Sequence, residues 1–456
     1  MLEHITYLGT KLPSFHDASE AVSKILRTTI GEKRVERITE RIGGERVVQR
    51  QEQVAAWSKL KLTEKEAAPP GVKAPEVASV MADGGRLQLR DPSPDAKSHW
   101  HEYKCGALQS LSSEVSTSDP FPQIPGFFLN QERMDKLSRE IAQVAARVDS
   151  PNDNPATDTP SASEISATVL ATVMGTEKES GVIDDTPPKV LEREVVATCQ
   201  DRRALKQPST EEISATVAKT EGDCGAIDYL PPEVVEREVV ATRQNSRAFG
   251  QHLASVAWAL GFFAAKHKAF VGDGQNWIWT EWERHFKPYG FVPILDFIHA
   301  LTHVYAAAMA DRPAKSGWPI YVRWITAVWN GDVASVISEL AIRQQELGLP
   351  TPEDGDTSPR TLVTKTLTYL QNQQSRMNYP EYRRLGLPIT SALMESTVKQ
   401  VNRRLKGSEK FWSDHGAEEL LQLVGDEFST TQPMAEFWRT RAENQTGYRT
   451  YSNRAA

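Results

Sequence analysis

The sequence predicts an α/β fold in which helices flank a mixed sheet of parallel and antiparallel strands. Residues 77–111 hold strand-like runs with the spacing of antiparallel hairpins. Short apolar strands then alternate with helical periods over residues 247–310, and such alternation places strands in parallel. Helical periodicity also fills residues 1–63 and 311–375. We therefore expect one mixed sheet with helical additions before and after it.

The composition is that of a folded protein with more than one structural unit. The chain has 456 residues, of which 39% are hydrophobic and 25% charged, and this length exceeds one ordinary core. Its longest apolar stretch, residues 255–265, is shorter than a membrane-spanning helix requires. The three cysteines show no disulfide pattern. We expect no membrane association and a cytoplasmic location.

The net charge of −7 is unevenly distributed along the chain. Residues 140–240 carry a net charge of −11, so the rest of the chain is positive, at +4. Residues 376–410 hold eight basic and three acidic side chains. Such a stretch suits contact with nucleic-acid phosphates, although a solvated helix face is the alternative interpretation.

Residues 136–246 form an acidic insertion that contains an internal duplication. The motif Glu-Ile-Ser-Ala-Thr-Val begins at Glu164 and again at Glu212. A longer motif, Pro-Pro-x-Val-x-Glu-Arg-Glu-Val-Val-Ala-Thr, begins at Pro187 and again at Pro231. Two copies are too few for a solenoid, and the polar, acidic composition predicts a largely disordered, solvated segment.

Two predicted strands are each followed by an Asp-Gly pair. Val77–Ala82 precedes Asp83, whose two following glycines indicate a hairpin turn, and a second apolar strand precedes Asp273. Side chains at strand ends project into a shared crevice, and a neighbouring glycine leaves room for a phosphate backbone. Carboxylate oxygens are the ligands that Mg²⁺ prefers. Each Asp-Gly pair, taken alone, also fits an ordinary turn.

A third acid lies on a predicted helix near residues 389–405. Ser391, Glu395, Lys399 and Arg403 recur at steps of four, so they share one face of this helix. An acid that binds metal beside cations that bind phosphate would suit chemistry on DNA, whereas a solvated, salt-bridged face is the alternative. The candidate phosphate ligands are Lys399, Arg403, Arg404 and Lys406.

Asp296, His299 and His303 are spaced by three and four residues, so they share a face of another predicted helix. This spacing is compatible with zinc ligands. Core or capping roles for the histidines are the commoner alternative. A third possibility is that His299 orients the catalytic acids or the substrate phosphate.

Four sequence strings occur in the order seen in a known family. They are Met-Ala-Asp83-Gly-Gly-Arg-Leu-Gln, Gly-Asp273-Gly-Gln-Asn-Trp-Ile-Trp, Ile-Leu-Asp296-Phe-Ile-His299-Ala-Leu-Thr-His303 and Met-Glu395-Ser-Thr-Val-Lys-Gln-Val-Asn-Arg-Arg-Leu-Lys-Gly. Together they resemble insertion-sequence transposases of the ISKra group and, more distantly, Mutator-like transposases. The resemblance covers residues 1–135 and 247–440.

This resemblance implies a DDE transposase with an RNase-H-like fold. Asp83, Asp273 and Glu395 would be the metal-binding triad, with Mg²⁺ as the cofactor and Mn²⁺ able to substitute, and His299 would orient the site. The reaction would be metal-dependent DNA strand cleavage and strand transfer. The partners would be the double-stranded DNA of the element's ends and of the target, bound by a homo-oligomer at the bacterial nucleoid, because joining two ends needs two active sites.

Two other functions remain open. The chain could be an inactive or truncated transposase-derived protein that binds DNA without cutting it. Alternatively, its acids could flank a sugar groove in a carbohydrate hydrolase, since the sequence is rich in Trp. The basic stretch at residues 376–410 favours DNA.

The same reasoning divides the chain into seven segments. They are an N-terminal helical unit that is a candidate for DNA binding (1–63), the first part of the catalytic domain (72–135), the acidic insertion (136–246), the second part of the catalytic domain (247–310), a helical insertion (311–375), the C-terminal part with the Glu395 helix (376–440) and a tail (441–456).

Overall fold

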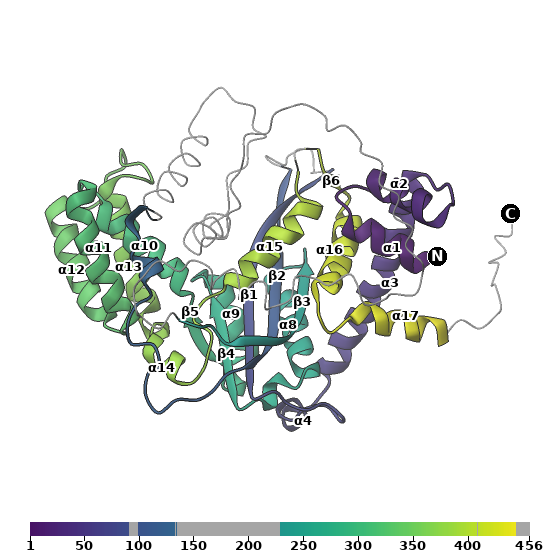
Figure 1. The fold of residues 1–456 in the computed structure, drawn as a ribbon, viewed down its shortest axis with the longest axis horizontal. Helices are drawn as coiled ribbons and strands as arrows, with labels where there is room; N and C mark the ends of the chain where they lie inside the picture. The colour runs from purple at the N-terminus through teal and green to yellow at the C-terminus, as the bar shows by residue number, and fades with distance from the viewer. Residues whose placement is uncertain (91–98, 133, 135–228, 408, 444–456) are drawn as a thin grey trace, which may run out of the picture.

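The computed structural model describes most of the chain outside the acidic insertion. The described residues are 1–90, 99–132, 134, 229–407 and 409–443 (Figure 1). Within this set, the side chains of Ala392 and Glu395 are not described. Most of the expected acidic insertion, residues 135–228, and most of the expected tail therefore lie outside the described residues.

A mixed sheet forms the centre of the fold, in the order β3-β2-β1-β4-β5. The first three strands are antiparallel, whereas β1, β4 and β5 run parallel to one another. A short sixth strand pairs in parallel with the far end of β1. The expected mixed sheet flanked by helices is thus confirmed. The strands are β1 (Val77–Leu89), β2 (Trp100–Ser112), β3 (Glu233–Thr242), β4 (His267–Gly272), β5 (Val292–Leu295) and β6 (Phe411–Trp412).

The expected hairpin turn at Asp83-Gly84-Gly85 is wrong, because β1 continues through these residues to Leu89. Neither glycine has a positive φ. Gly85 instead lies opposite Tyr103 of β2, and a Cβ atom on Gly85 would lie 2.3 Å from the Tyr103 ring. The glycine therefore makes room for a buried ring within a continuous strand.

The boundary expected for the acidic insertion is also wrong, because residues 233–242 form the edge strand β3. This strand lies within the second copy of the longer duplicated motif, which begins at Pro231. Val239, Val240 and Ala241 are buried, and the whole strand pairs with β2. Because acidic residues precede this short apolar run, the sequence pattern does not indicate that the segment is a strand of the core sheet.

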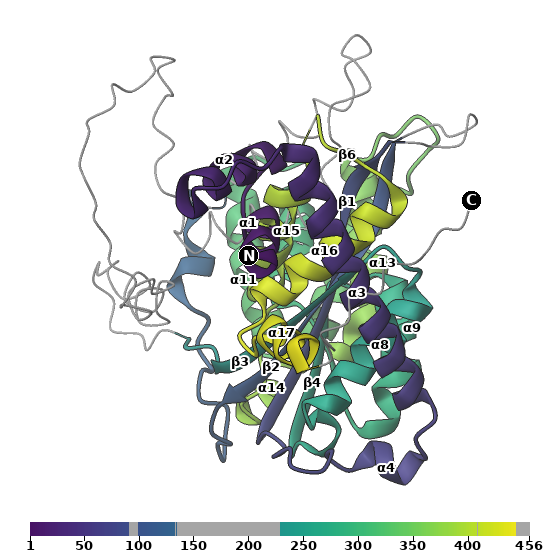
Figure 2. The same cartoon turned by 90° about the vertical axis from the view of Figure 1, so that its right-hand side faces the viewer.

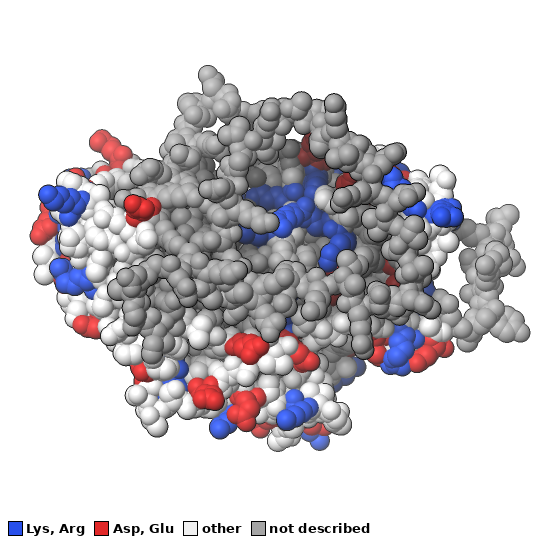
Figure 3. Space-filling model, in the orientation of Figure 1, with Lys and Arg blue, Asp and Glu red and all other residues white. Residues whose placement is uncertain are grey.

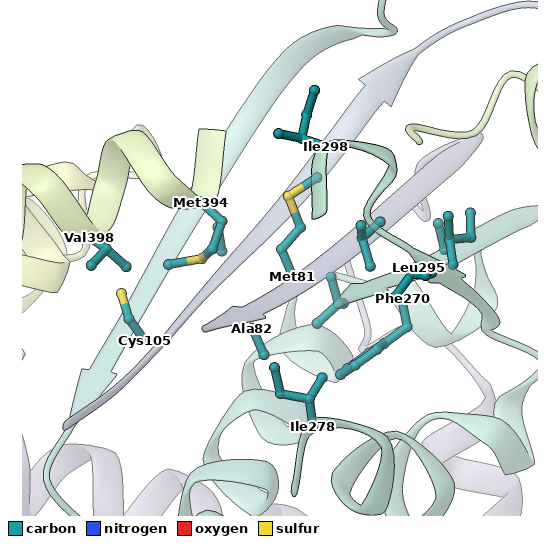
Figure 4. Close-up of a cluster of buried hydrophobic side chains, with 14 of the residues drawn as sticks. Met81, Ala82, Cys105, Phe270, Ile278, Leu295, Ile298, Met394 and Val398 are labelled. Carbon is teal, nitrogen blue, oxygen red and sulfur yellow. The ribbon is translucent and has the colours of Figure 1, made fainter. Parts of the chain in front are cut away.

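Helices cover both faces of the sheet, and the alternating side chains of the strands show which helix lies on which face. Met81 and Cys105 point toward the face where Met394 and Val398 lie, whereas Ala82 points toward Ile278 on the other (Figure 4). The helix α15 (Ala392–Leu405) belongs to the first face, and α8 (Ser246–Ala259) and α9 (Asn276–His285) belong to the second. The helix α16 (Asp414–Phe428) packs against α15 and the edge strand β3.

The N-terminal helices pack onto the rest of the protein and share its hydrophobic core (Figure 2). Arg46 and Arg50 form buried ion pairs with Asp426 and Glu418 of α16, at 2.9 and 2.7 Å. An N-terminal helical region is confirmed, with Ser14 capping its second helix. The helices are α1 (Leu2–Lys11), α2 (Phe15–Leu26), α3 (Glu32–Ser58) and α4 (Leu62–Glu66).

A group of helices follows β5 and lies at one end of the molecule (Figure 1). Within the helical region expected over residues 311–375, two of the helices are separated where Gly331 adopts a φ of +79° and Asp332 caps the second. No helix in the described ranges is long and apolar enough to cross a membrane. The remaining helices are α10 (Phe297–Met309), α11 (Ala314–Trp329), α12 (Val333–Leu347), α13 (Pro359–Gln373), α14 (Tyr379–Arg384) and α17 (Pro433–Glu443), with 3₁₀ turns η1 (Gly126–Leu129), η2 (Phe262–Ala264), η3 (Lys287–Tyr289) and η4 (Gln374–Arg376).

Candidate metal and nucleic-acid site

Asp83 lies in β1, and Asp273 directly follows β4, the parallel strand next to it. The pairing of β1 with β4 ends at Met81 and Val271, and each acid follows two residues later. Both are buried, with 4% and 8% of their surface exposed. Burial, followed by the charge of Asp273, raises the pKa of Asp83 to about 7. Two predicted site residues, 190 positions apart in the sequence, are therefore close enough to repel each other.

The two carboxyl groups are held in different ways. Asp83 lies within a strand, and its Oδ1 atom accepts a 2.6 Å hydrogen bond from the amide of Gly84. Asp273 follows the end of β4, where it accepts bonds from the amide and the side chain of Gln275, at 2.9 and 2.7 Å. One acid is thus fixed by the sheet and the other by a turn.

The turn at Asp273 is also fixed by helix α13 of the helical insertion. The Tyr369 hydroxyl donates a 2.7 Å hydrogen bond to the carbonyl of Asp273, and Gln373 donates a 3.2 Å bond to that of Gly274. Gly274 has a φ of +104°, and a Cβ atom there would lie 2.7 Å from the Tyr369 ring. Position 274 therefore requires glycine both for its backbone conformation and for this close approach.

Asp296 connects three elements beside the two acids. Its carboxylate caps α10 through the amide of Ile298 at 3.0 Å, and it also contacts His299 Nδ1 at 2.8 Å. It accepts a third bond, of 2.5 Å, from the Ser391 hydroxyl at the start of α15. Asp296 raises the pKa of Asp83 and His299 lowers it, so both lie within electrostatic reach of the candidate site.

The described residues do not support zinc binding by Asp296, His299 and His303. No group of three or more His, Cys, Asp or Glu side chains among them is placed to hold a metal ion. The ring of His303 stacks on Tyr369 at 4.0 Å, and burial lowers the pKa of His303 to about 4. His303 is therefore a packing residue in this structure.

The backbone of Glu395 lies near the start of α15, the helix that packs on β1 and β2. Its neighbours Met394 and Val398 face the side of the sheet toward which Cys105 points (Figure 4). Because Asp83 lies opposite Cys105 and two residues beyond Met81, it belongs to this same face. The Glu395 side chain lies outside the described set, so its place in the triad stays a prediction.

Basic side chains gather on the surface over α15. Figure 3 shows Lys and Arg atoms clustered in the part of this face that α15 and β6 occupy in Figure 1. Arg403 is exposed, and Lys399 and Lys406 are partly exposed. The Lys406 ammonium lies 5.4 Å from the centre of the Trp100 ring. These three residues remain candidate phosphate ligands.

The expectation for Arg404 needs correction, because this residue is buried. Its guanidinium donates hydrogen bonds to the carbonyls of Gly9 and Pro13 and lies over the ring of Phe15. Burial lowers the pKa of Arg404 to about 10. Arg404 ties the N-terminal helices to α15 and has no access to a phosphate.

Tyr369, Gln373 and Gln275 were not among the predicted site residues. Tyr369 and Gln373 are four residues apart, so their shared helix face was visible in the sequence, but nothing there indicated that it meets the Asp273 turn.

Of the tryptophans near this turn, Trp279 and Trp282 are buried in the core.

No family model and no curated protein matches this chain.

Proposed function

We propose that this protein is a DDE-type transposase that cleaves and joins DNA strands with the help of divalent metal ions. The observation that carries the proposal is the buried, mutually repelling pair of Asp83, in β1, and Asp273, directly after the neighbouring parallel strand β4. The mixed sheet with helices on both faces supports the RNase-H-like assignment. Glu395 is included because of the resemblance in sequence and because its helix packs on the same sheet.

The donor set fits a hard divalent cation. Mg²⁺ is usually bound by one or two protein carboxylates together with water and substrate phosphates, and Asp83 and Asp273 supply two such groups. The raised pKa of Asp83 arises from burial and from Asp273, and a bound cation would offset both effects. When bound, the metal would activate a water or 3′-hydroxyl nucleophile and stabilise the leaving oxygen.

The surrounding residues would position the acids and the DNA. Asp296 and His299 would keep the start of α15 in place beside Asp83, and Tyr369 would hold the Asp273 turn. Lys399 and Arg403 would contact phosphates, which fixes the position of DNA without reading its sequence. The acids and the cations would thus come from the same helix-covered face of the sheet.

The proposal is tested by metal binding and DNA cleavage with the same set of variants. Mn²⁺ binding is measured by electron paramagnetic resonance, and nicking is measured on a supercoiled plasmid that carries the DNA flanking this gene. Asp83→Asn and Asp273→Asn should weaken Mn²⁺ binding and abolish nicking. Asp332→Asn, which neutralises an exposed carboxyl group outside the site, should change neither property.

Three outcomes would separate the alternatives. Mn²⁺ binding that is unchanged in both site variants would refute the metal site. Tight DNA binding with intact metal binding but no nicking would favour the inactive DNA-binding protein. Hydrolysis of a sugar polymer that needs no metal and depends on Asp83 would favour the carbohydrate hydrolase.

A further inference from the structure

The edge of β2 next to α16 imposes specific requirements on the strand that binds it. Val239, Val240 and Ala241 of β3 are buried there. The Thr242 hydroxyl donates a 2.6 Å hydrogen bond to Glu418 of α16. On the outer side of β3, the amides of Arg237 and Val239 donate to the hydroxyls of Thr430 and Ser429, at 2.8 and 2.9 Å.

The first copy of the duplicated motif meets all of these requirements. Residues 187–198 differ from residues 231–242 at only two positions, where Lys189 corresponds to Glu233 and Leu191 to Val235. Glu233 and Val235 are both exposed in β3. The first copy is therefore identical to β3 at every buried position. It is also identical at every position whose side chain bonds to α16 or to the segment after α16.

The similarity ends soon after the strand. In the same alignment, Cys199 corresponds to Arg243 and Pro208 to His252, which is buried in the middle of α8. A proline in the middle of a helix removes a hydrogen bond and clashes with the preceding turn. Only the strand, and not the helix that follows it, could therefore be supplied by the first copy.

We propose that this edge is an interaction surface for either copy of the motif, so that residues 187–198 of the same chain can replace β3. The first copy is tethered to α8 through residues 199–245, which gives it a high effective concentration at the edge. The second copy is favoured because only it carries Arg243, which pairs with Asp414. The replaced state is thus a minority state that becomes dominant when β3 is weakened.

Disulfide trapping detects which copy occupies the edge. Ser112 lies opposite Glu233, and both are exposed, so cysteines at these positions report the normal strand. In a Cys199→Ser, Cys224→Ser background, Ser112→Cys is combined with Glu233→Cys as the reference or with Lys189→Cys as the test. Cys105 is buried and burial raises the pKa of its thiol, so it should remain reduced.

The reference pair should form a disulfide within one chain, and the test pair should form it in a smaller fraction. Val239→Asp, which places a charge in the buried part of β3, should raise the yield of the test pair several-fold. Ser112→Cys with Lys178→Cys, in the same insertion but outside the motif, measures random encounters. A test yield no greater than this control, with and without Val239→Asp, would overturn the proposal. Disulfide-linked dimers in place of intrachain links would overturn the same-chain assignment.

Thermal unfolding provides an independent test that does not depend on cysteines. Val239→Asp alone should remain folded, with a modest fall in melting temperature, because the first copy takes its place. Val195→Asp alone, at the matching position of the first copy, should have no effect. The double variant should lose the folded state. If Val239→Asp alone is as unfolded as the double variant, the first copy does not replace β3.

Discussion

The Ser391 hydroxyl donates a 2.5 Å hydrogen bond to the Oδ2 atom of Asp296, which joins the start of α15 to the start of α10. Both residues are buried, and the same carboxylate oxygen also contacts His299. The helix that carries Glu395 is therefore anchored to the start of α10, within electrostatic reach of Asp83.

Replacing Ser391 with alanine should destabilise the protein by about 1–3 kcal/mol, because a buried carboxylate loses one of its donors. The free energy of unfolding is measured by urea denaturation. Ser396→Ala on the same helix removes an exposed hydroxyl and serves as the control. Equal losses in the two variants would mean that the Asp296 contact contributes nothing specific.

A methyl group at position 85 should be far more costly than one at position 84. Gly85→Ala should destabilise the protein by about 1–3 kcal/mol, because its Cβ atom would overlap the ring of Tyr103, which is fully buried. In Gly84→Ala the nearest atom is the end of the Glu102 side chain, 3.2 Å away, which can move. Thermal unfolding of both variants checks this order, and a smaller loss for Gly85→Ala would contradict it.

Arg404 and Arg403 should behave differently although they are neighbours. Arg404→Ala should cost about 1.5–3 kcal/mol of stability, because charged hydrogen bonds to the carbonyls of Gly9 and Pro13 are lost. Arg403→Ala should leave stability nearly unchanged but reduce the salt dependence of DNA binding, if this exposed residue contacts phosphate. Urea denaturation and DNA titrations at several salt concentrations separate the two effects. Similar stability losses in both would contradict the assignment.

Glu238 should make the stability of the protein depend on pH. Burial, assisted by the charge of Asp426, raises the pKa of Glu238 to about 7, above its ordinary value of 4.5. Because the pKa of Glu238 is higher in the folded protein than in the unfolded chain, protonated Glu238 contributes to the stability of the fold. This contribution is complete below about pH 4.5 and is lost as the pH rises through 7. Glu238→Gln should therefore be more stable than the natural protein at pH 8, by roughly 1–3 kcal/mol, and no more stable at pH 4. A difference independent of pH would exclude this explanation.

The sequence predicted those parts of the fold in which the local hydrophobic pattern agrees with the way the element packs in the structure. The alternation of strands and helices after residue 247 was sufficient for β4, β5 and the helices between them, and it placed Asp273 correctly after β4. Asp83 was expected beside it because parallel strands carry their residues to the same edge. The position of Asp83 inside β1 was not predictable, because two glycines that admit the Tyr103 ring look the same in the sequence as two glycines in a turn.

Other predictions from the sequence were wrong where contacts between distant residues, and not the local composition, determine the structure. The strand β3 was assigned to the insertion because its acidic residues and its duplication resemble a solvated segment, while its pairing with β2 is invisible in the sequence. Arg404 was assigned to the surface because a cation on a basic helix is normally solvated. The acceptors that bury it belong to residues 9 and 13, almost 400 positions away.

The continuous course of β1 through Asp83 has a consequence for the proposed metal site. If Asp83 is a ligand of the proposed metal, its backbone has almost no conformational freedom left to lose on binding, because the residues on either side of it are paired with β2. That ordering entropy is lost during folding, so changes that loosen the β1–β2 pairing should weaken the proposed metal binding even where they leave every proposed ligand in place.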